Sequence, residues 1–218
     1  MGGIVRGSGE KGVVALAMPV SKEDNSGMHV PDSDHWTAAD LDHLPENGLR
    51  HEVLNGQLVV NAAPKLRHQV VVNALQRAIE AVLPAEYYAI PGVGILIGED
   101  EPIPDIVVGT GTIPLDDRGI AAAQIALALE VVSQSTTLTD RMLKPVLYAE
   151  AGIRNYWRIE TNRFKGQLPG ELLPVLFGYE LGEEGEYELV HRVSSGNKVG
   201  LSSPFDFTID PGDLLPGE

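Results

Sequence analysis

The sequence predicts one α/β domain built on a mixed β-sheet that is flanked by helices. Three observations support this class: an amphipathic helix pattern at 64–83, short β-prone runs on both sides of it, and a strand–helix–strand pattern at 125–160. Alternation of this kind favours a sheet with helices packed on its faces. The 218 residues, with 43% hydrophobic and 22% charged side chains, are typical of a globular domain.

Three segments differ in composition. Residues 1–34 are rich in Gly, Ser and Asp without periodicity, which predicts a flexible leader. The apolar run at 12–20 raises the question of a secretory signal, but it is short and interrupted, and an extension or a misplaced start codon fits it better. We expect residues 35–165 to form the core and residues 166–218 to add a C-terminal β extension to the same domain.

The formal charge of −15 argues at first against a nucleic-acid partner, because phosphate binding needs Lys and Arg. However, residues 1–48 carry 3 basic and 8 acidic side chains, residues 49–166 carry 11 and 13, and residues 167–218 carry 2 and 10. The middle of the chain is therefore nearly neutral and has room for a local basic surface. The absence of cysteine excludes disulfides and zinc–thiolate sites and fits a cytoplasmic protein. No apolar run approaches the roughly 18–20 residues of a membrane span, so we expect no membrane contact.

The first elements are a short helix and a hairpin. The run T-A-A-D-L-D-H-L, which begins at Thr37, starts like a capping box. In R-H-E-V-L-N-G-Q-L-V-V-N, at 50–61, two β-prone runs flank Asn55-Gly56, the strongest short hairpin signal. Glu52 lies on the first strand of this hairpin, and the pattern alone favours a solvated strand residue.

A helix is predicted at 64–83, where apolar residues recur three and four apart. His68 lies in its first turn, where a partly exposed surface histidine is commoner than a ligand. A strand is predicted at 87–97, and P-I-P-D-I-V-V-G predicts another short one that contains the single charge Asp105. Because a carboxylate is rarely buried without a partner, Asp105 requires a metal, an arginine or a backbone cap.

The stretch from 125 to 156 carries the chemistry. It begins with an apolar β-run that holds Glu130, continues through a polar turn at 133–137, and enters a helical segment with Asp140 and Lys144 four residues apart. The small side chains on the face of Glu130 leave space in front of its carboxylate. The alternative interpretation is simpler: Glu130 caps the turn, and Asp140 and Lys144 form a surface ion pair.

A metal site follows if Asp105 lies on a neighbouring strand. The carboxylates of Asp105 and Glu130, with the main-chain carbonyl of Val131, could then hold one Mg²⁺. A water of lowered pKa would be the nucleophile on a phosphodiester, and Lys144 would orient it, with Asp140 holding the ammonium.

The rest of the chain predicts further strands. One is expected at 153–160, and two more at 175–181 and 186–193 form a hairpin around an acidic turn. Five acidic residues between Glu180 and Glu188 indicate a solvated edge. A last short strand is expected at 205–209.

An ordered set of motifs resembles the Uma-type restriction endonuclease family of the PD-(D/E)XK nuclease superfamily. These motifs are H-E-V-L-N-G-Q-L-V, P-x-x-x-H, P-D at 104–105, E-V-V-S at 130–133, D-x-x-x-K at 140–144 and Y-A-x-A-G-I-x-N-Y-W ending at Trp157. The similarity covers roughly residues 36–160, and the order of the blocks is far more specific than any one block.

The resemblance implies a restriction endonuclease-like core, Mg²⁺ or Mn²⁺ at Asp105 and Glu130, and accessory catalytic roles for Glu52 and His68. The lysine that the superfamily places two residues after the glutamate is Val132 here, and Lys144 on the next helix takes its role. Pro145 follows Lys144 directly, so either the helix begins close to Lys144 or it is kinked there. A nucleic-acid partner, with DNA favoured, and a homodimer are expected.

Two functions remain open at this stage. The first is a Mg²⁺-dependent endonuclease that acts on DNA through a metal-activated water. The second is a non-catalytic binding or interaction module that keeps the nuclease fold and a vestigial site. A phosphohydrolase of small nucleotides is a weaker third candidate, because it would need a closed pocket. A basic rim near Asp105 would favour nucleic acid.

Overall fold

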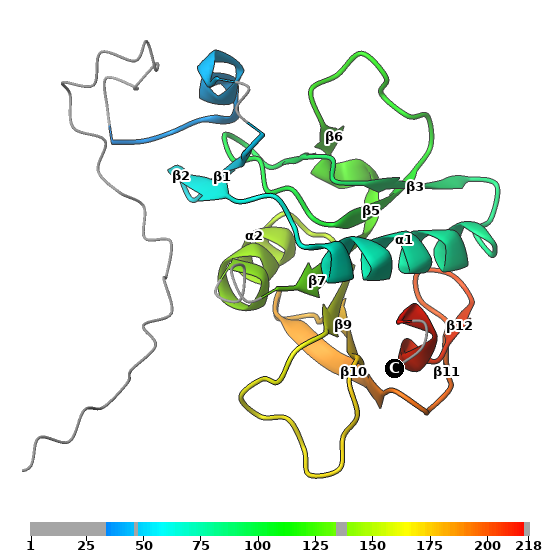
Figure 1. Cartoon of the computed structure of the whole chain (residues 1–218). Coiled ribbons are helices and arrows are strands. Elements are labelled where there is room, and N and C mark those ends of the chain that lie inside the picture. The colour runs from blue at the N-terminus through cyan, green and yellow to red at the C-terminus, as the bar shows by residue number, and fades with distance from the viewer. Residues whose placement is uncertain (1–33, 46–47, 134–138, 216–218) are drawn as a thin grey trace, which may run out of the picture.

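The computed structural model describes residues 34–45, 48–133 and 139–215 (Figure 1). Apart from Asp34, the predicted leader with its apolar run at 12–20 lies outside the described residues, and the predicted turn at 133–137 is described only at Ser133. Within the described residues, no helix combines the length and the apolar character that a membrane crossing requires.

The α-helices are α1 (Leu66–Glu80) and α2 (Lys144–Glu150), and shorter helical turns are η1 (Ala38–His43), η2 (Ala122–Gln124), η3 (Thr139–Leu143) and η4 (Pro211–Leu214). The strands are β1 (Arg50–Leu54), β2 (Gln57–Asn61), β3 (Tyr87–Pro91), β4 (Ile95–Leu96), β5 (Ile106–Thr110), β6 (Ile120–Ala121), β7 (Ile125–Val132), β8 (Asn155–Glu160), β9 (Val175–Leu181), β10 (Tyr187–Ser194), β11 (Val199–Leu201) and β12 (Phe207–Ile209).

The main sheet has six strands in the order β10-β9-β8-β7-β5-β3. The pair β7 and β8 is parallel, and the segment between them contains α2, whereas every other neighbouring pair is antiparallel. This mixed sheet confirms the predicted fold class. The hairpin predicted at 175–193 forms β9 and β10 and extends the sheet beyond β8.

The core lies on both faces of the sheet. Leu127 and Leu129 of β7 pack in one cluster with the apolar side of α1 and with β11, β12 and η4, whereas Ala128 packs in a second cluster with Tyr148 of α2. Alternate residues of a strand point to opposite faces, so one buried strand serves two layers. Figure 1 shows α1 and α2 on opposite sides of β7.

The β1–β2 hairpin forms as predicted. Asn55 and Gly56 have φ angles of 52° and 69°, the positive values that a two-residue primed turn requires, and Leu54 pairs with Gln57. Two predictions need correction. The helix is shorter than 64–83, and the strand at 87–97 is divided into β3 and β4, because the chain turns at Gly92 with a φ of 62°.

Candidate active site

Sheet register brings Asp105 next to Glu130. Strands β5 and β7 are antiparallel with Ile106 opposite Leu129, and Asp105 directly precedes β5. The backbone N–H of Asp105 donates to the Leu129 carbonyl at 3.0 Å, which ties Asp105 to the residue before Glu130. Asp105 and Glu130 line the same cleft and are 7% and 1% exposed. Two buried carboxylates therefore lie side by side.

The backbone of Val131 holds Asp105 in place. Its N–H donates to Asp105 Oδ2 at 2.8 Å. The carbonyl of the following residue, Val132, accepts from Thr161 Oγ1 on the opposite, β8 side. Because peptide groups alternate along a strand, the Val131 carbonyl faces the edge where Asp105 lies.

A histidine and an arginine approach the other oxygen of Asp105. His68 Nε2, from the first turn of α1, lies 3.0 Å from Oδ1, and the Arg50 guanidinium lies 3.6 Å from it. Burial alone would raise the pKa of Asp105, but the hydrogen bond and charge of His68, with Lys144 and the Val131 N–H, outweigh burial and lower it. Because an ionised carboxylate can only accept, Asp105 accepts a hydrogen bond from His68 Nε2–H. His68 Nδ1 is buried without a hydrogen-bond partner among the described residues.

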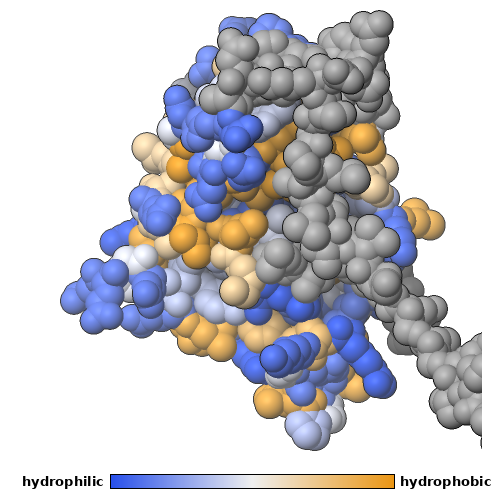
Figure 2. All heavy atoms as spheres, turned by 90° about the vertical axis from the view of Figure 1, so that its left-hand side faces the viewer, coloured by the Kyte–Doolittle hydropathy of each residue, from blue (hydrophilic) through white to orange (hydrophobic). Residues whose placement is uncertain are grey.

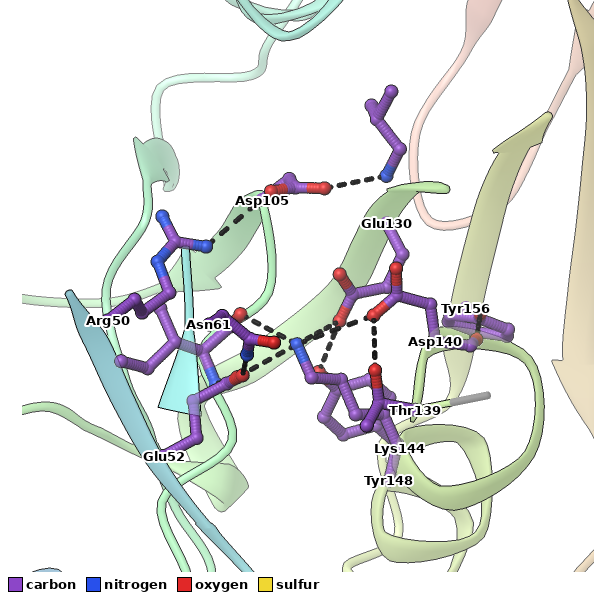
Figure 3. Close-up of polar contacts among 12 residues, drawn as sticks. Arg50, Glu52, Asn61, Asp105, Glu130, Thr139, Asp140, Lys144, Tyr148 and Tyr156 are labelled. Carbon is purple, nitrogen blue, oxygen red and sulfur yellow. Dashed lines mark hydrogen bonds and ion pairs between the residues drawn. The ribbon is translucent and has the colours of Figure 1, made fainter. Parts of the chain in front are cut away.

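Lys144 lies in a cage of oxygen atoms (Figure 3). Its Nζ is 2.8 Å from Glu52 Oε1, 3.2 Å from Glu130 Oε1 and 3.7 Å from Asp140 Oδ1, and it donates to the Ile103 carbonyl at 2.9 Å. Burial alone would lower the pKa of Lys144, but the surrounding carboxylates outweigh burial and raise it. Lys144 therefore stays charged although it is only 3% exposed.

Pro145 is accommodated because α2 begins at Lys144. Proline then occupies the first turn, where a missing N–H costs nothing and the fixed φ suits the helix. The preceding turn, Thr139–Leu143, has the wider π-helical pitch. The regular α-helix thus begins at Lys144, as one of the two arrangements required, and it follows directly on an irregular helical turn.

Glu130 is held by the same helix. The Tyr148 hydroxyl donates to Glu130 Oε1 at 2.8 Å, one helical turn after Lys144. Burial raises the pKa of Glu130 well above its usual range; Lys144 opposes this rise, and the neighbouring carboxylates add to it. No described residue donates a hydrogen bond to the second oxygen, Oε2, which remains accessible for a ligand.

Glu52 supports Lys144 from the hairpin. Its Oε1 accepts from the Ile103 N–H at 2.6 Å, and its Oε2 accepts from Asn61 Nδ2, also at 2.6 Å. Glu52 is 1% exposed, so the expectation of a solvated strand residue is wrong. The reason is tertiary: the hairpin folds over the segment before β5 and buries this face.

These residues line one small cleft, with about 40 Å³ of space open to water. Its lining consists of Arg50, Glu52, Asn61, Ala62, Pro64, His68, Asp105, Glu130, Ser133, Asp140 and Lys144. This volume holds a few waters, because one water needs at least roughly 10–15 Å³. Figure 2 views the molecule from the left-hand side of Figure 1. Hydrophilic and hydrophobic residues of the described part are interspersed on the surface visible there.

Every side chain predicted for the site therefore reaches the same cleft. The alternative of a surface Asp140–Lys144 pair is wrong, because these side chains are 2% and 3% exposed. His68 is also less exposed than expected. Tyr148 and Asn61 were not predicted, although Tyr148, four residues after Lys144, lies on the same helix face.

No group of three or more His, Cys, Asp or Glu side chains in the described residues has the arrangement of a preformed metal site. The donor set still suits a hard cation. Asp105 is ionised, Glu130 Oε2 accepts no hydrogen bond from the described residues, and the Val131 carbonyl faces the same edge. A magnesium ion takes several waters as ligands, so two carboxylates and one carbonyl suffice.

Comparison with known proteins supports a nuclease fold. A crystal structure of a "putative nuclease belonging to DUF820" from Anabaena variabilis matches with a TM-score of 0.59 and 19% identity, over 82% of this chain and 96% of that one. No curated protein matches. The model of the family described as "Uma2: Putative restriction endonuclease" matches residues 38–211. The chain therefore belongs to this Uma2 family.

Proposed function

We propose that this protein is a divalent-metal-dependent nuclease that hydrolyses phosphodiester bonds of DNA, with Mg²⁺ or Mn²⁺ as its cofactor. One observation carries the proposal: the side chains of Asp105, just before β5, of Glu130 on β7 and of Lys144 on α2 line one cleft. The two carboxylates, at the ends of neighbouring strands, could bind a metal ion, and the lysine on α2 could bind a phosphate.

In this proposal Asp105, Glu130 and the Val131 carbonyl hold the metal. A bound Mg²⁺ would neutralise charge on the phosphate and supply a water of lowered pKa. The protein's part is to fix the oxygens before the metal arrives. The Val131 N–H and His68 hold Asp105, and Tyr148 holds one oxygen of Glu130, so that each carboxylate has one defined orientation.

Lys144 has the role of a phosphate-binding and water-orienting cation. Its amine is held by Glu52 and the Ile103 carbonyl, so its position does not depend on substrate. We assign Glu52 and His68 as positioning residues, because Glu52 contacts Lys144 and His68 contacts Asp105. For the metal ion, the geometry of the oxygen ligands matters more than the choice between Mg²⁺ and Mn²⁺, because Mn²⁺ accepts the same ligands.

The size of the cleft favours a polymer substrate. Small-molecule pockets enclose roughly 300–1,000 Å³, far more than the space found here. A free nucleotide would not be enclosed, whereas a DNA strand lying across the mouth would place only one phosphate inside. Arg50 at the edge of the cleft supplies part of the basic rim that nucleic acid requires, and Arg141 is engaged with Glu160.

The alternative is a nuclease-fold binding module without catalysis. One observation favours it: Lys144 already forms ion pairs with both Glu52 and Glu130, and an ammonium in this position can substitute for a metal. The two functions differ in whether the cleft binds a divalent cation.

The test is calorimetric titration of Mg²⁺ and Mn²⁺ into the natural protein and into Asp105→Asn and Glu130→Gln, with nicking of supercoiled plasmid DNA measured in parallel. We expect binding and nicking in the natural protein and loss of both in each variant. Asp206→Asn is the matched control, because Asp206 is exposed and does not line the cleft. A natural protein that is folded but binds neither ion would refute the nuclease and leave the binding module.

A further inference from the structure

A row of side chains continues from the cleft across the outer strands. Glu130 on β7 is in register with Arg158 on β8, Arg158 with Phe177 on β9, and Phe177 with Arg192 on β10. Paired residues on neighbouring strands share a face, so all four lie on the face that carries the carboxylates. The strands are about 4.8 Å apart, which places Arg158 one strand away from Glu130.

Arginines and aromatic rings alternate in this row. The Arg158 guanidinium carbon lies 4.8 Å from the centre of the Phe177 ring and 5.4 Å from that of Tyr179, and Arg192 lies over Phe177 at 5.0 Å. Two glutamates form ion pairs with the arginines of this row and with Arg141. We call these five side chains the arginine group: Arg141, Arg158, Arg192, Glu160 and Glu171. A guanidinium group that lies over an aromatic ring keeps its N–H groups at its edge, where they can still donate hydrogen bonds.

The three arginines differ in how many donors they have already used. Arg141 donates twice to Glu160, and Arg192 donates twice to Glu171. Arg158 approaches Glu160 through Nε at 3.2 Å, but this nitrogen makes no hydrogen bond, and its two terminal nitrogens make none to the described residues. Arg158 therefore keeps an open pair of donors beside the cleft.

Charge is segregated along these strands. The acidic turn of the β9–β10 hairpin, with Glu183, Glu184 and Glu186, lies near Arg154, at the beginning of β8. Arg158 lies toward the other end of β8, near the end of β7 that holds Glu130. A polyanion would be repelled from the turn and attracted to the end where the carboxylate cleft opens.

We propose that Arg158, whose guanidinium lies over the rings of Phe177 and Tyr179, binds the backbone phosphate next to the one that is cleaved. The proposal rests on the nuclease function above and adds a substrate-binding residue outside the cleft. A planar guanidinium with two free N–H groups suits the bidentate geometry of a phosphate. Phe177 is only 4% exposed, so the contact is with the sugar–phosphate chain rather than with stacked bases.

The experiment is fluorescence anisotropy of a labelled DNA duplex in EDTA, which prevents hydrolysis, with salt varied between about 50 and 200 mM. For Arg158→Gln we expect weaker binding and a salt dependence of log K that is shallower by about 0.9, the value of one lost phosphate contact on duplex DNA. Arg154→Gln is the matched control: it removes the same charge from an exposed residue just before β8, and we expect an unchanged slope.

The outcomes separate this proposal from the one it rests on. A natural protein that binds and nicks DNA, with an unchanged slope in Arg158→Gln or an equal loss in Arg154→Gln, would overturn only the role of Arg158. A natural protein that does not bind DNA would overturn both. If Arg158→Gln does not fold, Arg158→Lys decides: binding weakened about threefold or more with the slope retained supports a bidentate contact, and unchanged binding refutes it.

Discussion

Two neighbouring groups of charged side chains, one buried and one partly exposed, have opposite charge imbalances. The first, the lysine group, contains one cation and three carboxylates: Lys144, Glu52, Glu130 and Asp140. The second, the arginine group, contains three cations and two carboxylates. The lysine group therefore has more carboxylates than cations, and the arginine group has more cations than carboxylates.

The difference shows what each group can receive. Burial, with a smaller contribution from the neighbouring carboxylates, raises the pKa of Glu130 and favours its protonated form, and a divalent cation could replace that proton. The arginine group cannot lower its net positive charge in a corresponding way, because an arginine does not lose its proton. Its excess charge is available to an external anion. A group that favours a cation next to a group that favours an anion would suit the proposed metal-dependent hydrolysis of a phosphodiester.

The largest expected effect comes from removing the single cation of the lysine group. Lys144→Met leaves buried carboxylates without their partner, and we expect a loss of about 3–5 kcal/mol in the free energy of unfolding, as for other broken buried ion pairs. Urea denaturation measures it. Lys65→Met is the matched control, because Lys65 is exposed at the start of α1 and should change stability by less than about 0.5 kcal/mol. Equal effects would show that Lys144 is not needed to balance the carboxylates.

A smaller effect is expected in the arginine group. Glu160→Gln removes the charge that accepts two hydrogen bonds from Arg141, at 2.7 and 2.6 Å, and we expect a loss of roughly 1.5–3 kcal/mol by urea denaturation. DNA affinity should rise in the same variant, because the excess of positive charge grows. A variant that loses both stability and DNA affinity would contradict the view that the arginine group has positive charge available to bind DNA.

Much of this arrangement could be predicted from the sequence. The apolar run with Glu130, the isolated Asp105 and the spacing of Asp140 and Lys144 indicated the members of the site. Their distances depended on β5 pairing with β7, a long-range contact that no local pattern contains. Pro145 left open whether the helix begins close to Lys144 or is kinked there, and the sequence alone did not show that a π-helical turn precedes α2.

The features that could not be predicted share a cause. Glu52 looked solvated because hairpin alternation cannot show what covers its face, and it is buried by the segment that leads into β5. Arg158 alternates with Trp157 and Ile159, which is typical of a strand with one polar face. Its significance comes from Phe177, a residue nineteen positions later that β9 places beside it. Cross-strand partners decide both cases, and register is a tertiary property.

The smallest expected effect concerns the aromatic contacts within the arginine group. A double-mutant cycle of Phe177→Leu and Arg192→Met, followed by urea denaturation, should give a coupling of about 0.5–1 kcal/mol, the usual contribution of a partly exposed cation–π contact. Phe207→Leu with Arg192→Met is the control cycle, because Phe207 stacks on Trp157 on the other face and should not couple. A coupling in the first cycle alone would mean that the rings hold the arginines in place. No coupling would mean that the Phe177 ring does not stabilise Arg192, and that the hydrogen bonds to Glu171 position it without help from the ring.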